Sequence, residues 1–163
     1  MRLTSKKFPK GTRVSGIIFS SQKDQVALME RHREGRHYFA FPGGGVEDLD
    51  KTVVDTLKRE MKEELGIEIQ GERRMYEIHI GGHSKQIFFI CETKNETLRL
   101  TGEELEKNST TDQYKPVWVK IGELSQLVLF PIEIRDWLVE DLKKGNFTAR
   151  KQVFDSMESM KSQ

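Results

Sequence analysis

A single cysteine, Cys91, occurs among the 163 residues of the sequence. One cysteine can form neither an internal disulfide nor a zinc site made of several thiolates, and such scarcity fits a reducing cytosol. Cys91 ends the apolar run 87–91, so we expect a buried, unreactive thiol rather than a reactive one. The cysteine content therefore favours a cytoplasmic protein without disulfide bonds.

An excess of charge of one sign is also lacking, because 27 Lys and Arg balance 26 Asp and Glu, for a net charge of +1. This balance gives no reason to expect a nucleic acid or a membrane surface as the partner. No apolar run approaches the roughly 18 residues that a membrane-spanning helix needs. The basic residues 1–13 are not followed closely by an apolar segment, so they do not resemble a secretory signal.

Internal repeats and low-complexity segments are absent as well, and the length of the chain predicts one compact domain. Hydrophobic periodicity predicts strands at 14–20, 26–30, 37–41, 73–80, 85–92 and 116–120, and a short additional strand at 98–100. It predicts helices at 52–65 and 131–144 and a short helix at 121–127. Residues 101–114 are polar and indicate a loop, whereas the last eighteen residues carry a weak apolar stripe, typical of a packed or frayed tail. This order favours an α+β or mixed α/β sandwich over a regular βαβ alternation.

Three glutamates, Glu60, Glu63 and Glu64, gather at the end of the predicted helix 52–65, just before Gly66 as its expected stop. Residues three and four apart share a helix face, so these like charges repel one another at a cost of about 0.2–0.5 kcal/mol per pair. They also face the negative end of the helix dipole, a further cost of about 0.3–1 kcal/mol per charge. A divalent cation with oxygen ligands would offset this repulsion.

The segment 43–67, GGGVEDLDKTVVDTLKREMKEELGI, resembles the Nudix box, the loop–helix–loop signature of Nudix hydrolases. Its second half carries every residue type of the pattern: Arg59, Glu60, Met61, Glu63, Glu64, Gly66 and Ile67. Flanking segments extend the resemblance over residues 12–145, which leaves an N-terminal segment 1–11 and a C-terminal extension 146–163. The resemblance implies an α/β fold, namely a Nudix-like α/β/α sandwich with a mixed β-sheet and a loop–helix–loop metal site.

The first half of the box departs from the family pattern. Lys51 stands where the family has a glutamate, and Asp50 lies one position earlier, so a one-residue insertion within 48–50 would reconcile both halves. In the family this glutamate mainly supports the box and does not bind the essential metal. The resemblance therefore implies that Asp50 or Glu47 takes its place.

The resemblance implies Mg²⁺, with Mn²⁺ as an alternative, as the cofactor. Glu60, Glu63 and Glu64 would hold the metal together with a backbone carbonyl, for which Gly44 is the preferred donor. We expect glycine at position 44 because it permits both a close approach of the backbone and a positive φ.

Arg59 lies four residues before Glu63 and would orient the acids through charge-assisted hydrogen bonds. Glu63 is the preferred general base. A second candidate lies in the polar segment 101–114, where Glu104 is preferred and Glu103 is the neighbouring choice. The sequence leaves the choice of base open.

The implied activity is Mg²⁺-dependent hydrolysis of the diphosphate linkage in a nucleoside diphosphate derivative, such as a nucleoside triphosphate, a nucleotide sugar or ADP-ribose. Two alternatives are a non-catalytic nucleotide-sensing module on the same fold and an interaction domain whose helix is merely acidic. We expect a small-molecule nucleotide as the partner, no nucleic acid, no membrane, and a monomer or homodimer.

The candidates for binding phosphates are Arg31, Arg33 and Arg36, of which Arg31 and Arg36 are preferred. The candidates for stacking on a base are Tyr38, Phe39, Tyr114 and Trp118, of which Tyr38 and Phe39 are preferred. The alternatives are that the arginines belong to solvated turns and that the aromatic side chains belong to the core. His32, His37 and His83 are isolated in the sequence, so we expect structural or surface roles for them rather than metal ligation.

Overall fold

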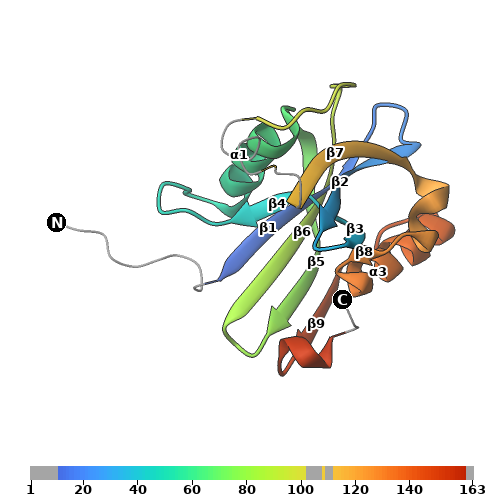
Figure 1. Ribbon diagram of the computed structural model, residues 1–163. Helices are drawn as coiled ribbons and strands as arrows, with labels where there is room; N and C mark the ends of the chain where they lie inside the picture. Colours follow the sequence, from blue (N-terminus) through green and yellow to red (C-terminus); the bar gives the residue numbers. More distant parts are fainter. Residues whose placement is uncertain (1–10, 102–107, 109–111, 161–163) are drawn as a thin grey trace.

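In the computed structural model, which describes residues 11–101, 108 and 112–160, a mixed sheet of nine strands forms the frame of the molecule (Figure 1). Its order is β8-β3-β2-β1-β6-β5-β9, and β4 pairs with β1 while β7 pairs with β2. The strands are β1 (Thr12–Phe19), β2 (Gln25–Arg33), β3 (Arg36–Ala40), β4 (Gly43–Gly45), β5 (Gln70–Ile80), β6 (Ser84–Glu92), β7 (Asp112–Lys120), β8 (Leu129–Phe130) and β9 (Arg150–Phe154).

Strand β1 is the junction of this sheet. It runs parallel to β6 along its whole length, but it pairs with β2 only near its end, at Ile18 and Phe19. Near its start, β1 pairs instead with the glycine strand β4, where Val14 lies opposite Gly44. Strands β2 and β4 therefore occupy different stretches of β1, and β2 continues away from it in company with β3 and β7.

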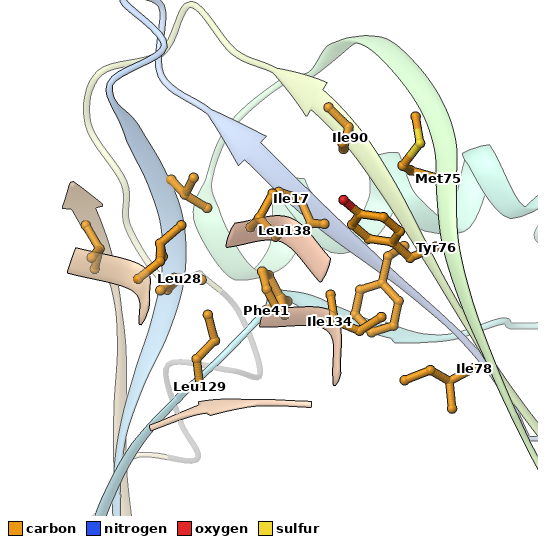
Figure 2. Close-up of a cluster of buried hydrophobic side chains, with 14 of the residues drawn as sticks. Ile17, Leu28, Phe41, Met75, Tyr76, Ile78, Ile90, Leu129, Ile134 and Leu138 are labelled. Atoms are coloured by element: carbon orange, nitrogen blue, oxygen red, sulfur yellow. The ribbon is translucent and has the colours of Figure 1, made fainter. Parts of the chain in front are cut away.

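The two long helices cover opposite faces of the sheet. Helix α1 (Val53–Leu65) packs its Leu57, Met61 and Leu65 onto one hydrophobic core. Helix α3 (Ile132–Lys144) packs Ile134 and Leu138 onto the second core, where Figure 2 shows both side chains beside those of the strands. The prediction of an α/β/α sandwich with a mixed sheet is confirmed.

Local signals fix both ends of α1. Thr52 is the N-cap, and its side chain and that of Asp55 each accept a hydrogen bond from the other's backbone N–H, at 3.1 and 3.0 Å. Gly66 ends the helix in the left-handed conformation, with φ of 66°. These caps confirm the predicted helix, and they hold its acidic last turn in a defined position.

Cys91 is buried, as expected, and burial raises the pKa of its thiol. None of the described helices is long and apolar enough to cross a membrane. Short 3₁₀ helices occupy Ile121–Gln126, near the predicted short helix, and Met157–Ser159.

Two predictions of secondary structure are wrong. Residues 98–100 form no strand, and β7 begins at Asp112, within the segment 101–114 that was expected to be a loop. The reason is tertiary pairing, because β7 aligns with β2 from Asp112 opposite Arg33 onwards. The end of the chain is packed rather than frayed over the described residues, since β9 pairs with β5, and Phe154 and Met160 are buried.

Candidate metal centre

The acidic residues of α1 face the glycine strand β4. Glu60 and Glu64 are buried, with 8% and 7% of their surface exposed, whereas the side chain of Glu63 is 49% exposed. Oε1 of Glu64 accepts a hydrogen bond from the backbone N–H of Gly43 at 2.7 Å. Two of the three predicted ligands therefore lie against the backbone of β4, and the third lies at the edge towards solvent.

Gly44 leaves room for a carboxylate. A Cβ at this position would lie 2.1 Å from Oε1 of Glu60, closer than any real contact. The expectation that Gly44 has a positive φ is wrong, because it is not among the glycines with that conformation. Glycine is required here for the close approach of backbone and carboxylate alone.

Arg59 is the centre of an ion-pair network. Its Nη1 lies 2.9 Å from Oε1 of Glu60, 3.1 Å from Oε2 of Glu47 and 3.6 Å from Oε2 of Glu63. Its Nη2 donates to the backbone carbonyl of Gly45 at 3.1 Å. One guanidinium thus joins α1 to the loop that precedes it and contacts two of the predicted metal ligands.

The other side of this guanidinium is held by Asp50. Nε and Nη2 of Arg59 donate to the two oxygens of Asp50 at 3.2 and 2.8 Å, a bidentate pair. Oδ2 of Asp50 also accepts from the hydroxyl of Thr56 and from the backbone N–H of Glu47, each at 2.8 Å. The hydrogen bond from Arg59 is the main cause that lowers the pKa of Asp50 to about 2. The carboxylate that supports this loop therefore comes from Asp50, one position before the lysine that stands in place of the family's glutamate.

A cleft of about 570 Å³ opens beside these acids. It is lined by β4, Glu60 and Glu64, by Arg13 of β1, whose Nη2 donates to the backbone carbonyl of Gly43 at 3.4 Å, and by Arg31, Asp112 and Tyr114 of β2 and β7. Arg13 and Asp112 were missing from the predicted site, whereas Arg31 and Tyr114 were among the candidates. The register of β2 and β7 places Arg31 opposite Tyr114, and this pairing could not be read from the sequence.

Arg31 is the one arginine predicted to bind phosphates that lines the cleft. Its guanidinium lies 5.1 Å from the centre of the Tyr114 ring, and its Nη2 lies 3.6 Å from Oδ1 of Asp112. The aromatic ring and the carboxylate hold the arginine beside the cleft that Glu60 and Glu64 also line. A positive charge therefore lines the same cleft as the acidic helix end.

The remaining predicted residues lie elsewhere. Tyr38 is opposite Arg31 in the pairing of β3 with β2, and the guanidinium of Arg36 lies 5.3 Å from the Tyr38 ring. Phe39 packs against the core beneath α3. Glu104 and Glu103 lie outside the described residues.

The residues at this site fit a hard divalent cation. Carboxylate and carbonyl oxygens are the ligands that Mg²⁺ prefers, and Glu60, Glu63 and Glu64 supply carboxylates from one helix end. Gly44 lines the same cleft, and the Glu60 carboxylate lies where a Cβ on Gly44 would be. The arrangement can hold a metal ion in the cleft, where an anionic ligand can reach the ion from solvent.

Comparison with known proteins agrees with this geometry. A family model described as the NUDIX domain matches residues 9–139. Among curated proteins, the 8-oxo-dGDP phosphatase NUDT18 of Danio rerio is 29% identical over 92 residues, which cover 55% of this chain and 27% of that protein. The match thus spans little more than a quarter of that relative's length.

Solved structures with the same fold include a NUDIX hydrolase from Nitrosomonas europaea, with a TM-score of 0.68 and 16% identity over 91% of this chain and 80% of that chain. A mutator MutT protein from Bacillus halodurans has a TM-score of 0.62 and 18% identity over 93% and 94% of the two chains. The NUDIX domain of Shewanella oneidensis NrtR, complexed with ADP-ribose, has a TM-score of 0.59 and 11% identity over 87% and 94%. At these identities the likeness concerns the fold.

Proposed function

The chain belongs to the Nudix family of pyrophosphohydrolases, and on that premise we propose that it uses a divalent metal, Mg²⁺ or Mn²⁺, to hydrolyse the diphosphate linkage of a nucleoside diphosphate derivative. The observation that carries this proposal is the network in which Asp50 holds Arg59 and Arg59 holds Glu60. This network is complete although Lys51 departs from the family pattern, and this supports the proposal of a catalytic site.

Each residue of the centre has a role in this proposal. Glu60, Glu63 and Glu64 would hold the metal with the backbone of Gly44, and the bound ion would supply charge neutralisation at the diphosphate and a more acidic water. Glu63 is the most exposed of the three carboxylates and is our preferred general base, since it can reach a water at the mouth of the site.

The basic and aromatic side chains that line the cleft would bind the substrate. Arg31 and Arg13 line the cleft and would pair with phosphate oxygens, which Arg recognises better than Lys because its guanidinium is planar and bidentate. Tyr114, which packs under Arg31, offers an aromatic face in the same cleft. The name of the Danio rerio relative, 8-oxo-dGDP phosphatase, supports a nucleoside diphosphate, and the NrtR domain complexed with ADP-ribose supports a nucleotide-sugar ligand.

A substrate panel with Mg²⁺ and with Mn²⁺ tests the activity. It contains nucleoside triphosphates, oxidised nucleoside di- and triphosphates, nucleotide sugars, ADP-ribose and dinucleoside polyphosphates. We expect metal-dependent phosphate or nucleotide release from at least one member. Tight binding without turnover across the panel would instead identify a nucleotide-sensing module.

The variant Glu63→Gln tests the assignment of the base. It keeps the size of the side chain and removes its charge, and we expect turnover to fall by about 10²-fold or more. Glu68→Gln is the matched control, because Glu68 is an exposed glutamate just beyond the end of α1. If Glu63→Gln turns over as fast as Glu68→Gln, the assignment of Glu63 is wrong.

A further inference from the structure

A second group of metal-binding side chains lies on the other face of strand β2. Along this strand Val26 and Leu28 point into the core beneath α3, whereas Ala27 and Met29 point towards α1. Because side chains alternate along a strand, Glu30 and His32 continue the face of Val26 and Leu28. The metal centre at α1 faces the opposite side.

Pairing of β2 with β3 adds a third side chain. His37 lies directly opposite His32 in the register, so two histidines that are isolated in the sequence become neighbours. Nε2 of His37 is 2.8 Å, and Nε2 of His32 is 3.9 Å, from Oε2 of Glu30. One ligand atom from each of the three residues lies within 4.8 Å of the other two.

These distances fit one small ion. A tetrahedral zinc site with bonds of about 2.0–2.1 Å places its ligand atoms about 3.3 Å apart. The two distances to Glu30, 2.8 and 3.9 Å, lie on either side of that value. The histidines are about half exposed, with 55% and 49% of their side chains accessible, so an ion can reach them from solvent.

We propose that Glu30, His32 and His37 form a binding site for a divalent transition metal, with Zn²⁺ as the best match. Two imidazoles and one carboxylate are a donor set that zinc accepts, with a fourth position left for water. Imidazole also suits Cu²⁺ and Ni²⁺, whereas Mg²⁺ prefers oxygen. The site is therefore distinct in chemistry, as well as in position, from the all-oxygen centre at α1.

The backbone around this site is already arranged for binding. Glu34 and Gly35 have φ of 51° and 77°, and they form the two-residue turn that joins β2 to β3 and sets His32 opposite His37. Only side chains have to move. The two imidazole rings stack in parallel, with centres 4.2 Å apart and an angle of 5°, and they must tilt to direct both nitrogens at one ion.

The positive charge of Lys115 lowers the affinity of the site for a cation but does not block it. Nζ of Lys115 lies 3.9 Å from Oε1 of Glu30, the oxygen that does not face the histidines. The Lys115 side chain is 71% exposed and can turn towards solvent. A bound ion would link β2 and β3 directly behind Arg31 and Tyr38, which face the other side of the same strand pair.

Titration of the full chain with Zn²⁺, in the presence of excess Mg²⁺ to compete at the acidic centre, tests the proposal. Calorimetry and the imidazole NMR signals are the two measurements. We expect one Zn²⁺ per chain at this site and simultaneous shifts of the His32 and His37 ring signals. His32→Gln and His37→Gln should each lower the affinity by about tenfold or more, because each removes one of three ligands.

His79→Gln is the matched control, because His79 pairs with Glu77 at 3.1 Å but belongs to no group of three metal-ligating side chains among the described residues. It should bind Zn²⁺ like the wild type. Circular dichroism checks that every variant is folded, and two separate ligand variants keep the test valid if one of them is not. Wild-type affinity in both His32→Gln and His37→Gln, or Zn²⁺ shifts that leave their ring signals unchanged, would overturn the proposal.

Discussion

The carboxylate of Asp50 binds the guanidinium of Arg59 through two hydrogen bonds, of 3.2 Å from Nε and 2.8 Å from Nη2. The side chain of Asp50 is only 7% exposed, so this charge-assisted pair is well shielded from water. Lys51, which takes the family's position for a glutamate, is exposed. Asp50 therefore makes the contact to Arg59 from the position before Lys51, in agreement with the hypothesis of a one-residue insertion.

The first prediction concerns Asp50→Asn. The amide can no longer accept two charge-assisted hydrogen bonds, so Arg59 loses its fixed orientation towards Glu60. We expect kcat/KM on the substrate found by the panel to fall by about tenfold or more, and the free energy of unfolding to fall by about 1–3 kcal/mol. Steady-state kinetics and urea denaturation measure the two effects.

Asp48→Asn is the control for this change, since Asp48 is an exposed aspartate in the same loop. It removes the same charge two residues away and should change both quantities little. Equal kinetics for Asp50→Asn and Asp48→Asn would show that the bidentate pair does not support the site.

The second prediction compares two neighbouring glycines. A Cβ at Gly44 would lie 2.1 Å from the Glu60 carboxylate, whereas a Cβ at Gly45 would meet only the backbone oxygen of Thr12, at 3.9 Å. Gly44→Ala must therefore displace Glu60, and we expect activity to fall by about tenfold or more with a stability loss of about 1–3 kcal/mol. Metal titration by calorimetry, together with kinetics, measures the result.

Gly45→Ala adds the same methyl group to the next residue in ordinary van der Waals space, and we expect it to retain most of the wild-type activity. A parallel loss in both variants would mean that the backbone flexibility of the glycine strand, rather than its approach to Glu60, is what matters.

The acidic half of the site could be predicted because it is local. Glu60, Glu63 and Glu64 share one helix end, and the capping residues Thr52 and Gly66 are part of the same segment. The grouping of the other lining residues could not be predicted, since Arg13 and Tyr114 reach the cleft from strands about 100 residues apart in the chain. Only strand register brings such residues together.

The same reason explains why strand β9 was not predicted. Strand β9 is largely exposed and carries no alternation of apolar and polar residues, so nothing local distinguishes it from a polar tail. Its backbone pairing with β5 creates the strand. His32 and His37 likewise become neighbours only through the turn between β2 and β3.

The third prediction concerns pH. Glu77 accepts a hydrogen bond from Nε of Arg74 at 2.8 Å, and this contact is the main cause that lowers the pKa of Glu77 from 4.5 to about 2. A carboxylate whose pKa is lowered by folding stabilises the folded state above its unfolded pKa. This contribution is therefore complete above about pH 4.5 and is lost as the pH falls towards 2.

Urea denaturation of the wild type and of Glu77→Gln between pH 7 and pH 3 measures this effect. The stability difference between the two proteins should be largest near pH 7 and should shrink as the pH approaches 3. Glu123→Gln, at an exposed glutamate, is the control for the general effect of a lost charge. A stability difference that stays constant with pH would show that folding does not lower the pKa of Glu77.

The fourth prediction concerns Asp141, a fully buried carboxylate on α3. It accepts hydrogen bonds from the Tyr76 hydroxyl at 2.5 Å, from Nη2 of Arg150 at 2.7 Å and from the backbone N–H of Thr148 at 3.1 Å. Burial raises the pKa of Asp141, but the hydrogen bonds from Tyr76 and Arg150 outweigh it, and the net result is a lowered pKa. One charge therefore joins α3, β5 and the start of β9.

Asp141→Ala leaves the Tyr76 hydroxyl and the Arg150 guanidinium without this acceptor, so we expect a loss of about 3–5 kcal/mol in the free energy of unfolding. Hydrogen exchange should show β9 opening before the rest of the sheet, because Arg150 begins that strand and loses its buried anchor. Glu140→Gln removes the exposed partner of the same arginine, at 3.1 Å, and should have a much smaller effect. If both variants weaken the protein equally, the anchor of β9 is its backbone pairing with β5 and not the buried carboxylate.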